Sequence, residues 1–195
     1  MELARKRLAT PACFASDAEP EDADVVATDA TGDVPFRGNG PECRRAIRAN
    51  LASELRGCER DCLGEAVEWR DVGLYALSGL FYAADFADWA LRSLNSTAIA
   101  GFPSPRFADL EKAADFVCSK RESDLSSAKP AHAFTGSSKL PHRCFEINYQ
   151  VELFKLYGIP DDGRITYVDT IDGHDVEWTL GAHLHRHAWN GSNEL

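Results

Sequence analysis

The strongest helical pattern in the chain reads "DVGLYALSGLFYAADFADWALRSL" and covers residues 71–94. Asp71 is a good N-cap, because its carboxylate can accept a hydrogen bond from an unpaired amide of the first helical turn. Apolar residues then recur at helical spacing and give the segment a broad face for burial, which includes Leu74, Leu77, Phe81 and Ala84. The sequence therefore predicts a long core helix over residues 71–94.

Three further segments also carry helical signals. Residues 40–58 and 105–120 each place apolar side chains on one face at helical spacing, and residues 144–157 are predicted to form a further helix. The first is expected to end at Gly57 and the third at Gly158, because glycine readily adopts the conformation that terminates a helix.

The remaining segments complete the predicted fold class. The stretch "RITYVDTI" (164–171) alternates in polarity and is typical of a strand, and "EWTLGAHLHRH" (177–187) predicts a final helix. Residues 121–140 are polar and are expected to form a loop. Helices predominate and at least one strand is present, so we predict a helix-rich α/β fold.

The composition is that of one globular domain. The chain has 195 residues, of which 44% are hydrophobic and 27% are charged, which suffices for one core but not comfortably for two. The formal net charge is 21 − 31 = −10. This argues against duplex nucleic acid as a partner, because such binding depends on Lys and Arg. A nucleotide remains compatible, since a local basic group or a divalent cation offsets the repulsion. The sequence contains no segment long and apolar enough to cross a bilayer.

The cysteines and glycosylation sequons favour an oxidising compartment, and therefore a secreted or lumenal protein. An even number of cysteines in a loop-rich chain is typical of disulfides, and here they are Cys13, Cys43, Cys58, Cys62, Cys118 and Cys144. Their spacing does not fit a zinc site, because no second close pair or paired histidine follows. Sequons begin at Asn95 and Asn190. The first residues lack the apolar core of a signal peptide, so we expect a longer N-terminus.

Several motifs, together with the order of the cysteines, resemble a known family. The motifs are "LYALSGLFYAADF" (74–86), "CFEINYQVELFKLYGI" (144–159) and "DVEWTLGAHL" (175–184). In this order they resemble the C-terminal part of the apyrases, which are ecto-nucleoside triphosphate diphosphohydrolases. These enzymes hydrolyse nucleoside tri- and diphosphates to monophosphates. The resemblance implies the C-terminal lobe of an actin/Hsp70-like (ribonuclease H-like) enzyme with two lobes. We place this lobe at residues 34–188, after an acidic loop or partly disordered segment (1–33) and before a short tail (189–195).

The resemblance also implies how the cysteines pair. In the family, the counterparts of Cys58 and Cys62 bond each other, and so do the counterparts of Cys118 and Cys144. The counterparts of the two remaining cysteines bond partners further upstream. In this chain those two, Cys13 and Cys43, are therefore expected to be free, mispaired or joined to each other.

The catalytic groups of the apyrases have no counterpart in the sequence. Their phosphate-binding loops, of the forms Asp-x-Gly-Ser-Ser-Gly-Thr-Arg and Asp-x-Gly-Gly-Ala-Ser, are absent, and so is the glutamate between them that activates water. The resemblance thus implies a chain that supplies the nucleobase-binding lobe, with no catalytic residue of its own. Its partners are the missing N-terminal lobe and a nucleotide that arrives with Ca²⁺ or Mg²⁺. The alternative is a secreted, non-catalytic binding module that is stabilised by disulfides.

By motif position, the resemblance implies a nucleobase site made from an aromatic ring and a cation. Tyr82 matches the stacking aromatic, with an ordinary core residue as the alternative. Lys139 matches the cation, but lysine lacks the flat guanidinium that stacks on a base, so Arg143 is a second candidate. Both are alternatively solvated loop charges. Asp175 and Trp178 belong to the last motif, where they contact the base or support the helix start.

Two other patterns are interpreted as structural. "FTGSSK" (134–139) has small residues that allow the backbone to approach a phosphate, but it lacks the P-loop spacing and is interpreted as a plain loop. His183, His185 and His187 lie on the predicted final helix without a carboxylate partner. We interpret them as residues favoured by the helix dipole rather than as metal ligands.

Overall fold

The computed structural model describes residues 10–15, 17, 38–54, 73–171 and 174–175. Within these ranges the fold is helix-rich α/β with a small parallel sheet. The α-helices are α2 (Gly40–Glu54), α3 (Gly79–Ser93), α4 (Phe107–Cys118), α5 (Glu122–Ser127) and α6 (Arg143–Leu156). In the described part of the chain, no helix is long and apolar enough to cross a membrane.

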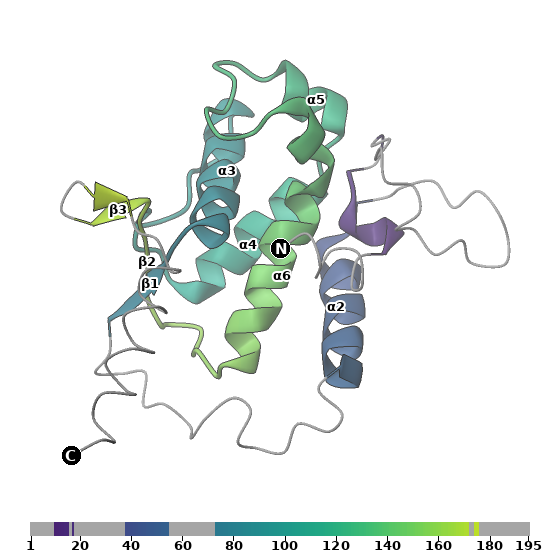
Figure 1. Cartoon of the computed structure of the whole chain (residues 1–195). Helices are drawn as coiled ribbons and strands as arrows, with labels where there is room; N and C mark the ends of the chain where they lie inside the picture. Colours follow the sequence, from purple (N-terminus) through teal and green to yellow (C-terminus); the bar gives the residue numbers. More distant parts are fainter. Residues whose placement is uncertain (1–9, 16, 18–37, 55–72, 172–173, 176–195) are drawn as a thin grey trace, which may run out of the picture.

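Helix α6 lies at the centre of the helical layer (Figure 1). It contacts α2, α3 and α4, and α3 also packs against α4. Burial reaches polar groups as well: Gln150 on α6 is fully buried, and its Nε2 donates a 2.8 Å hydrogen bond to the Tyr167 hydroxyl. Burial raises the pKa of the Tyr167 phenol well above its usual value.

The strands are short and lie to one side of the helices (Figure 1). β1 (Leu74–Ala76) pairs in parallel with β2 (Ile165–Tyr167), so that Leu74 lies opposite Ile165. β3 (Thr170–Ile171) pairs antiparallel with β4 (His174–Asp175). The predicted strand at 164–171 is therefore divided into two short strands, β2 and β3.

The predicted helix over 71–94 is wrong in its first part. Residues 74–76 form β1, and α3 begins only at Gly79. Ser78 has a φ of 53°, a left-handed conformation that interrupts a right-handed helix. A short apolar run fits a strand as well as a helix, and here the pairing with β2 decides between them. Asp71, the expected N-cap, lies outside the described residues.

The predicted loop at 121–140 contains helical structure that the sequence did not indicate. It holds α5 and most of a 3₁₀ helix, η5 (Ser137–His142). The carboxylate of Asp17 accepts hydrogen bonds from the amides of Glu122 and Ser123 and from the Ser123 hydroxyl, and so it caps α5. Burial acts to raise the pKa of Asp17, but the hydrogen bonds from Ser123 and Glu122 prevail and lower it. This cap comes from a residue 105 positions before Glu122, beyond the reach of a local pattern.

The predicted helices at 105–120 and 144–157 are confirmed as α4 and α6, within the usual variation of helix ends. The predicted helix at 40–58 is confirmed as α2 as far as Glu54. Its expected end at Gly57 and the predicted helix at 177–187 lie outside the described residues.

Two disulfides connect the described elements. Cys13–Cys43 joins the 3₁₀ helix η1 (Pro11–Cys13) to α2, and Cys118–Cys144 joins the end of α4 to the start of α6. The second bond is the pairing that the family resemblance implies. The first bond shows that Cys13 and Cys43 are joined to each other, which is one of the three outcomes expected for these two cysteines. Cys58 and Cys62 lie outside the described residues.

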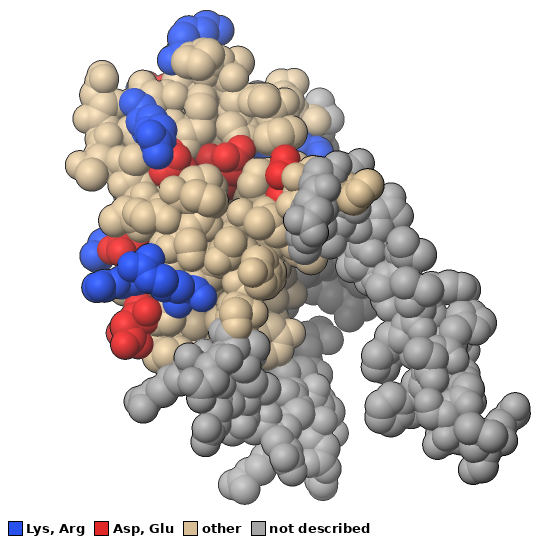
Figure 2. Space-filling model, turned by 90° about the vertical axis from the view of Figure 1, so that its left-hand side faces the viewer, with Lys and Arg blue, Asp and Glu red and all other residues tan. Residues whose placement is uncertain are grey.

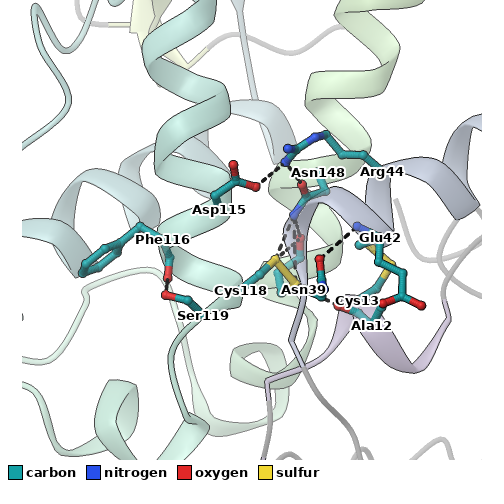
Figure 3. The surroundings of a disulfide bond; sticks show 12 residues. Ala12, Cys13, Asn39, Glu42, Arg44, Asp115, Phe116, Cys118, Ser119 and Asn148 are labelled. Carbon is teal, nitrogen blue, oxygen red and sulfur yellow. Dashed lines mark hydrogen bonds and ion pairs between the residues drawn. A yellow bond between two sulfur atoms is a disulfide. The ribbon is translucent and has the colours of Figure 1, made fainter.

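The polar side chains of Arg44 and Asn148 lie beside these disulfides (Figure 3). Asn148 Nδ2 donates to Cys118 Sγ over 2.9 Å and to the Cys144 carbonyl over 2.8 Å. Its Oδ1 accepts from Arg44 Nη1 over 2.7 Å, and the same guanidinium nitrogen lies 2.8 Å from Asp115 Oδ1. We call the two disulfides, Arg44 and Asn148 the disulfide cluster. Because Arg44 and Asn148 are buried and fully partnered, this part of the molecule is a structural core rather than a binding surface.

Candidate functional site

An aromatic cluster lies at the beginning of α3. The Tyr82 ring packs against Phe134 with 5.1 Å between centroids and a tilt of 45°. Phe81 contacts both rings, at 5.4 Å from Tyr82 and 6.2 Å from Phe134. Tyr82 is half-buried and Phe134 is 44% exposed. Phe81 also packs against the core, whereas Tyr82 and Phe134 present aromatic surface to solvent, which is the arrangement that a stacking ligand requires.

The first turn of α3 fixes where Tyr82 lies. Ser78 leaves the strand conformation at positive φ, and its carbonyl accepts a 3.0 Å hydrogen bond from the Tyr82 amide. The chain thus turns from β1 directly into α3, so that Phe81 and Tyr82 lie in the first turn of the helix. Further along α3, fully buried residues such as Ala87 and Ala90 anchor the helix against the core.

Phe134 reaches the cluster from the 128–136 loop, which connects α5 to η5. The Trp89 indole on α3 donates a 2.8 Å hydrogen bond to the Pro130 carbonyl. The His132 ring contacts Trp89 at 5.5 Å and Phe86 at 5.4 Å between ring centroids. The loop is therefore laid against α3 by both hydrogen bonds and ring contacts, and it delivers Phe134 to the side of Tyr82.

Of the two candidate cations, only Lys139 is exposed. It lies on η5, three residues after Gly136, and in the described part of the chain no cation–π contact joins it to Tyr82. Arg143, in contrast, is 3% exposed and is the first residue of α6. Its guanidinium binds Glu146 at 2.6 Å and also contacts the hydroxyl of Thr135. Arg143 is thus neither a solvated loop charge nor a free cation for a base.

The last signature motif is only partly described. Asp175 lies in β4, paired with Thr170 of β3, and Trp178 lies outside the described residues, as do His183, His185 and His187. The structure therefore brings Tyr82 together with a residue that sequence reasoning missed, Phe134. The available signal was the aromatic residue that opens "FTGSSK". The small residues of this motif do not indicate the role of its phenylalanine. The segment forms the end of the 128–136 loop and the start of η5.

Charge is spread thinly over the face that Figure 2 shows. Figure 2 shows the side of the molecule on which the strands lie, with acidic residues in a short row between broad uncharged areas. Its Lys and Arg side chains fall in separate groups rather than in one stripe, which is not the footprint of a long phosphate backbone. Over the described ranges, no group of three or more His, Cys, Asp or Glu could hold a metal ion.

Comparison with known proteins identifies the family. A model of the GDA1/CD39 (nucleoside phosphatase) family matches residues 10–192, and the chain belongs to this family. No curated protein matched the chain. The match extends across α2, α3, α4 and α6, so both the disulfide cluster and the aromatic cluster lie inside the family region.

Proposed function

We propose that this chain supplies the nucleobase-binding lobe of an apyrase-type enzyme that hydrolyses nucleoside tri- and diphosphates. Membership of the nucleoside phosphatase family supports nucleotides as the substrate class. The observation that carries the proposal is the contact between half-buried Tyr82 and exposed Phe134, with 5.1 Å between ring centroids. An aromatic pair of this kind suits an enzyme that accepts several bases, because every base has a π-face on which to stack.

The division of labour within the enzyme follows from what the sequence contains. The family's phosphate-binding loops and general base have no counterpart in the printed sequence, whereas Tyr82 and Lys139 lie within the described residues. We assign base stacking to Tyr82 and further contacts with the base to Lys139, Asp175 and Trp178. A Ca²⁺ or Mg²⁺ ion bound to the nucleotide supplies charge neutralisation at the phosphates.

The architecture and location belong to the same proposal. We place the chain as one lobe of an actin/Hsp70-like enzyme in which the nucleotide lies between two lobes. The disulfides Cys13–Cys43 and Cys118–Cys144 support a secreted or lumenal protein, because such bonds persist in oxidising compartments.

The proposal is tested by phosphate release. We expect the 195-residue chain alone to release no phosphate from ATP or ADP. Fused to the N-terminal lobe of a family member, it should hydrolyse both nucleotides. In the fusion, Tyr82→Ala should raise KM roughly tenfold and change kcat little, because stacking stabilises substrate and transition state alike.

Tyr82→Phe is the matched control, since it keeps the ring and removes only the hydroxyl, and its KM should remain near that of the unmodified fusion. Turnover by the isolated chain that a point change within it abolishes would contradict the proposal. So would a Tyr82→Ala fusion with an unchanged KM.

A further inference from the structure

A chain of hydrogen bonds, here named the Asp85–Arg143 bridge, ties the 128–136 loop to two helices. His132 Nε2 lies 3.0 Å from Asp85 Oδ2 on α3, and His132 Nδ1 lies 2.7 Å from Thr135 Oγ1. From α6, Arg143 donates to the same Thr135 oxygen through Nε at 3.0 Å and Nη2 at 2.7 Å. Arg143 Nη2 also donates to the Phe134 carbonyl over 3.0 Å. The His132 side chain is only 5% exposed, so water competes little with these bonds.

The chemistry of the groups sets the direction of each bond. A carboxylate only accepts, so the N–H at His132 Nε2 donates to Asp85 Oδ2. The Thr135 oxygen has two lone pairs, and two N–H groups of Arg143 bind them. The order Asp–His–Thr resembles the arrangement of a base and a nucleophile. A hydroxyl oxygen with both lone pairs engaged has none left for attack, so the bridge holds the loop and performs no chemistry.

Phe134 lies in the loop segment that the Asp85–Arg143 bridge holds. Its carbonyl is bound by Arg143, and its neighbours His132 and Thr135 make the remaining bonds. A ring that is 44% exposed gains little from burial, and the ordering of its loop costs conformational entropy. The bridge offsets this cost by fixing the backbone on both sides of the ring. The ring is thereby kept against Tyr82.

We propose that Phe134 is a second nucleobase-stacking residue, and that His132 and Thr135 are positioning residues that hold its ring beside Tyr82. The inference rests on the function proposed above and extends it to residues that no motif assigns. The 45° tilt between the two rings means that a base stacked on one ring meets the edge of the other. Displacement of Phe134 therefore weakens base binding without touching any group that contacts phosphate.

The test uses ADP and the full 195-residue chain, followed by saturation-transfer NMR on the adenine protons. Thr135→Val keeps the shape of the side chain and removes the hydroxyl, and it should weaken ADP binding roughly fivefold through loss of stacking. Thr135→Ser retains the hydroxyl and should bind ADP within about twofold of the unmodified chain. Ribose 5-phosphate, which lacks a base, should bind all three chains equally. Nuclear Overhauser contacts between the Phe134 and Tyr82 rings should disappear only in Thr135→Val.

Asp85→Ala is the second variant, because the Asp85 side chain is 28% exposed and its removal creates no buried cavity. It breaks the same bridge at α3 and should weaken ADP binding in the same direction. Tyr82→Ala distinguishes failure of the positioning role from failure of the proposed function. If Tyr82→Ala loses ADP binding while Thr135→Val and Asp85→Ala bind ADP normally, the positioning role is wrong and the proposed function stands. The same conclusion follows if Thr135→Val and Thr135→Ser lose equal affinity for ADP. If Tyr82→Ala or the unmodified chain shows no base-dependent binding to lose, the proposed function fails and the inference fails with it.

Discussion

Arg143 and Cys144 are neighbours at the start of α6, yet they belong to regions that are held together differently. From Cys144, the disulfide cluster reaches α4 directly, and through Asn148 and Arg44 it reaches α2. From Arg143, the Asp85–Arg143 bridge reaches the 128–136 loop and α3 through hydrogen bonds alone. The first region includes two covalent bonds. The second depends on contacts that can be made and broken.

The comparison assigns different tasks to the two sides of α6. The side chains of the disulfide cluster are buried, so covalent bonds there stabilise the fold without restricting a ligand. The other side ends in Phe134, which is 44% exposed. Loops that bind ligands are drawn from the less stable parts of a structure, because they have to adjust when the ligand arrives. Stability and binding are therefore separable by mutation.

The largest effect is expected from removal of the Cys118–Cys144 bond. The double variant Cys118→Ala and Cys144→Ala frees a loop whose ends are 26 positions apart, and the free energy of unfolding should fall by roughly 3 kcal/mol. Urea unfolding measures this change. ADP affinity at low temperature, where the variant remains folded, should stay within about twofold of the unmodified chain, because stacking is untouched. An equally large loss of ADP affinity would show that the two regions are not separable.

An effect of intermediate size is expected from Arg44 and Arg143, which are the two buried arginines among the described residues. Arg44→Ala and Arg143→Ala each remove a buried guanidinium and its bonds to a carboxylate, and each should lower the free energy of unfolding by about 2 kcal/mol. Only Arg143→Ala should also separate the rings of Phe134 and Tyr82, because only Arg143 binds the loop. NMR contacts between the two rings distinguish the variants. Loss of these contacts in Arg44→Ala would show that the disulfide cluster also positions the two rings.

Tyr167, in β2, should make the free energy of unfolding depend on pH. Its folded-state pKa is raised by burial, so its stabilising contribution is complete below the unfolded pKa of about 10 and is lost as pH rises through the folded value. Tyr167→Phe should lower the free energy of unfolding by about 1 kcal/mol at pH 7, through loss of the Gln150 hydrogen bond. It should also remove part of the decline in stability above pH 10. Urea unfolding of both proteins at neutral and alkaline pH measures the two effects. Parallel declines would mean that Tyr167 ionises equally readily in the folded and unfolded states.

The smallest effect is expected at the exposed cap of α5. Asp17→Asn keeps the shape of the cap and removes its charge, so the free energy of unfolding at pH 7 should fall by less than about 1 kcal/mol. The lowered pKa of Asp17 means that its contribution is present above the unfolded pKa, near 4, and is lost as pH falls through the folded value. Amide exchange at Glu122 and Ser123 should accelerate in the variant. At low pH the two proteins should exchange alike.

Sequence reasoning predicted the elements that depend on local periodicity. Helix α4 has a clear apolar face, and α6 is followed by Gly158 at positive φ, so the positions of both helices follow from local signals. It failed at Leu74–Ala76, because the partner strand that decides the conformation lies at Ile165–Tyr167. It also failed at α5, whose cap is Asp17. In both places a distant part of the chain supplies the hydrogen bonds.

The candidate site was predictable only in part, for the same reason. Tyr82 is found by motif position, and its neighbours on α3 follow from the helix. Phe134 is brought to it by the bonds of His132 and Thr135, which a polar loop sequence does not reveal. The burial of Arg143 was likewise hidden, since a basic residue beside a helix start is usually solvated.

The parallel pairing of β1 with β2 has a consequence for biosynthesis. Ile165 is made 91 positions after Leu74, its partner in the register. At ordinary rates of translation, β1 waits on the order of 5 to 20 seconds for that partner. During this interval Tyr75, which is 63% exposed even in the finished fold, lies on an unpaired strand edge. The nascent chain therefore exposes an unpaired strand edge, a site for misassociation, from the time α3 leaves the ribosome until β2 emerges.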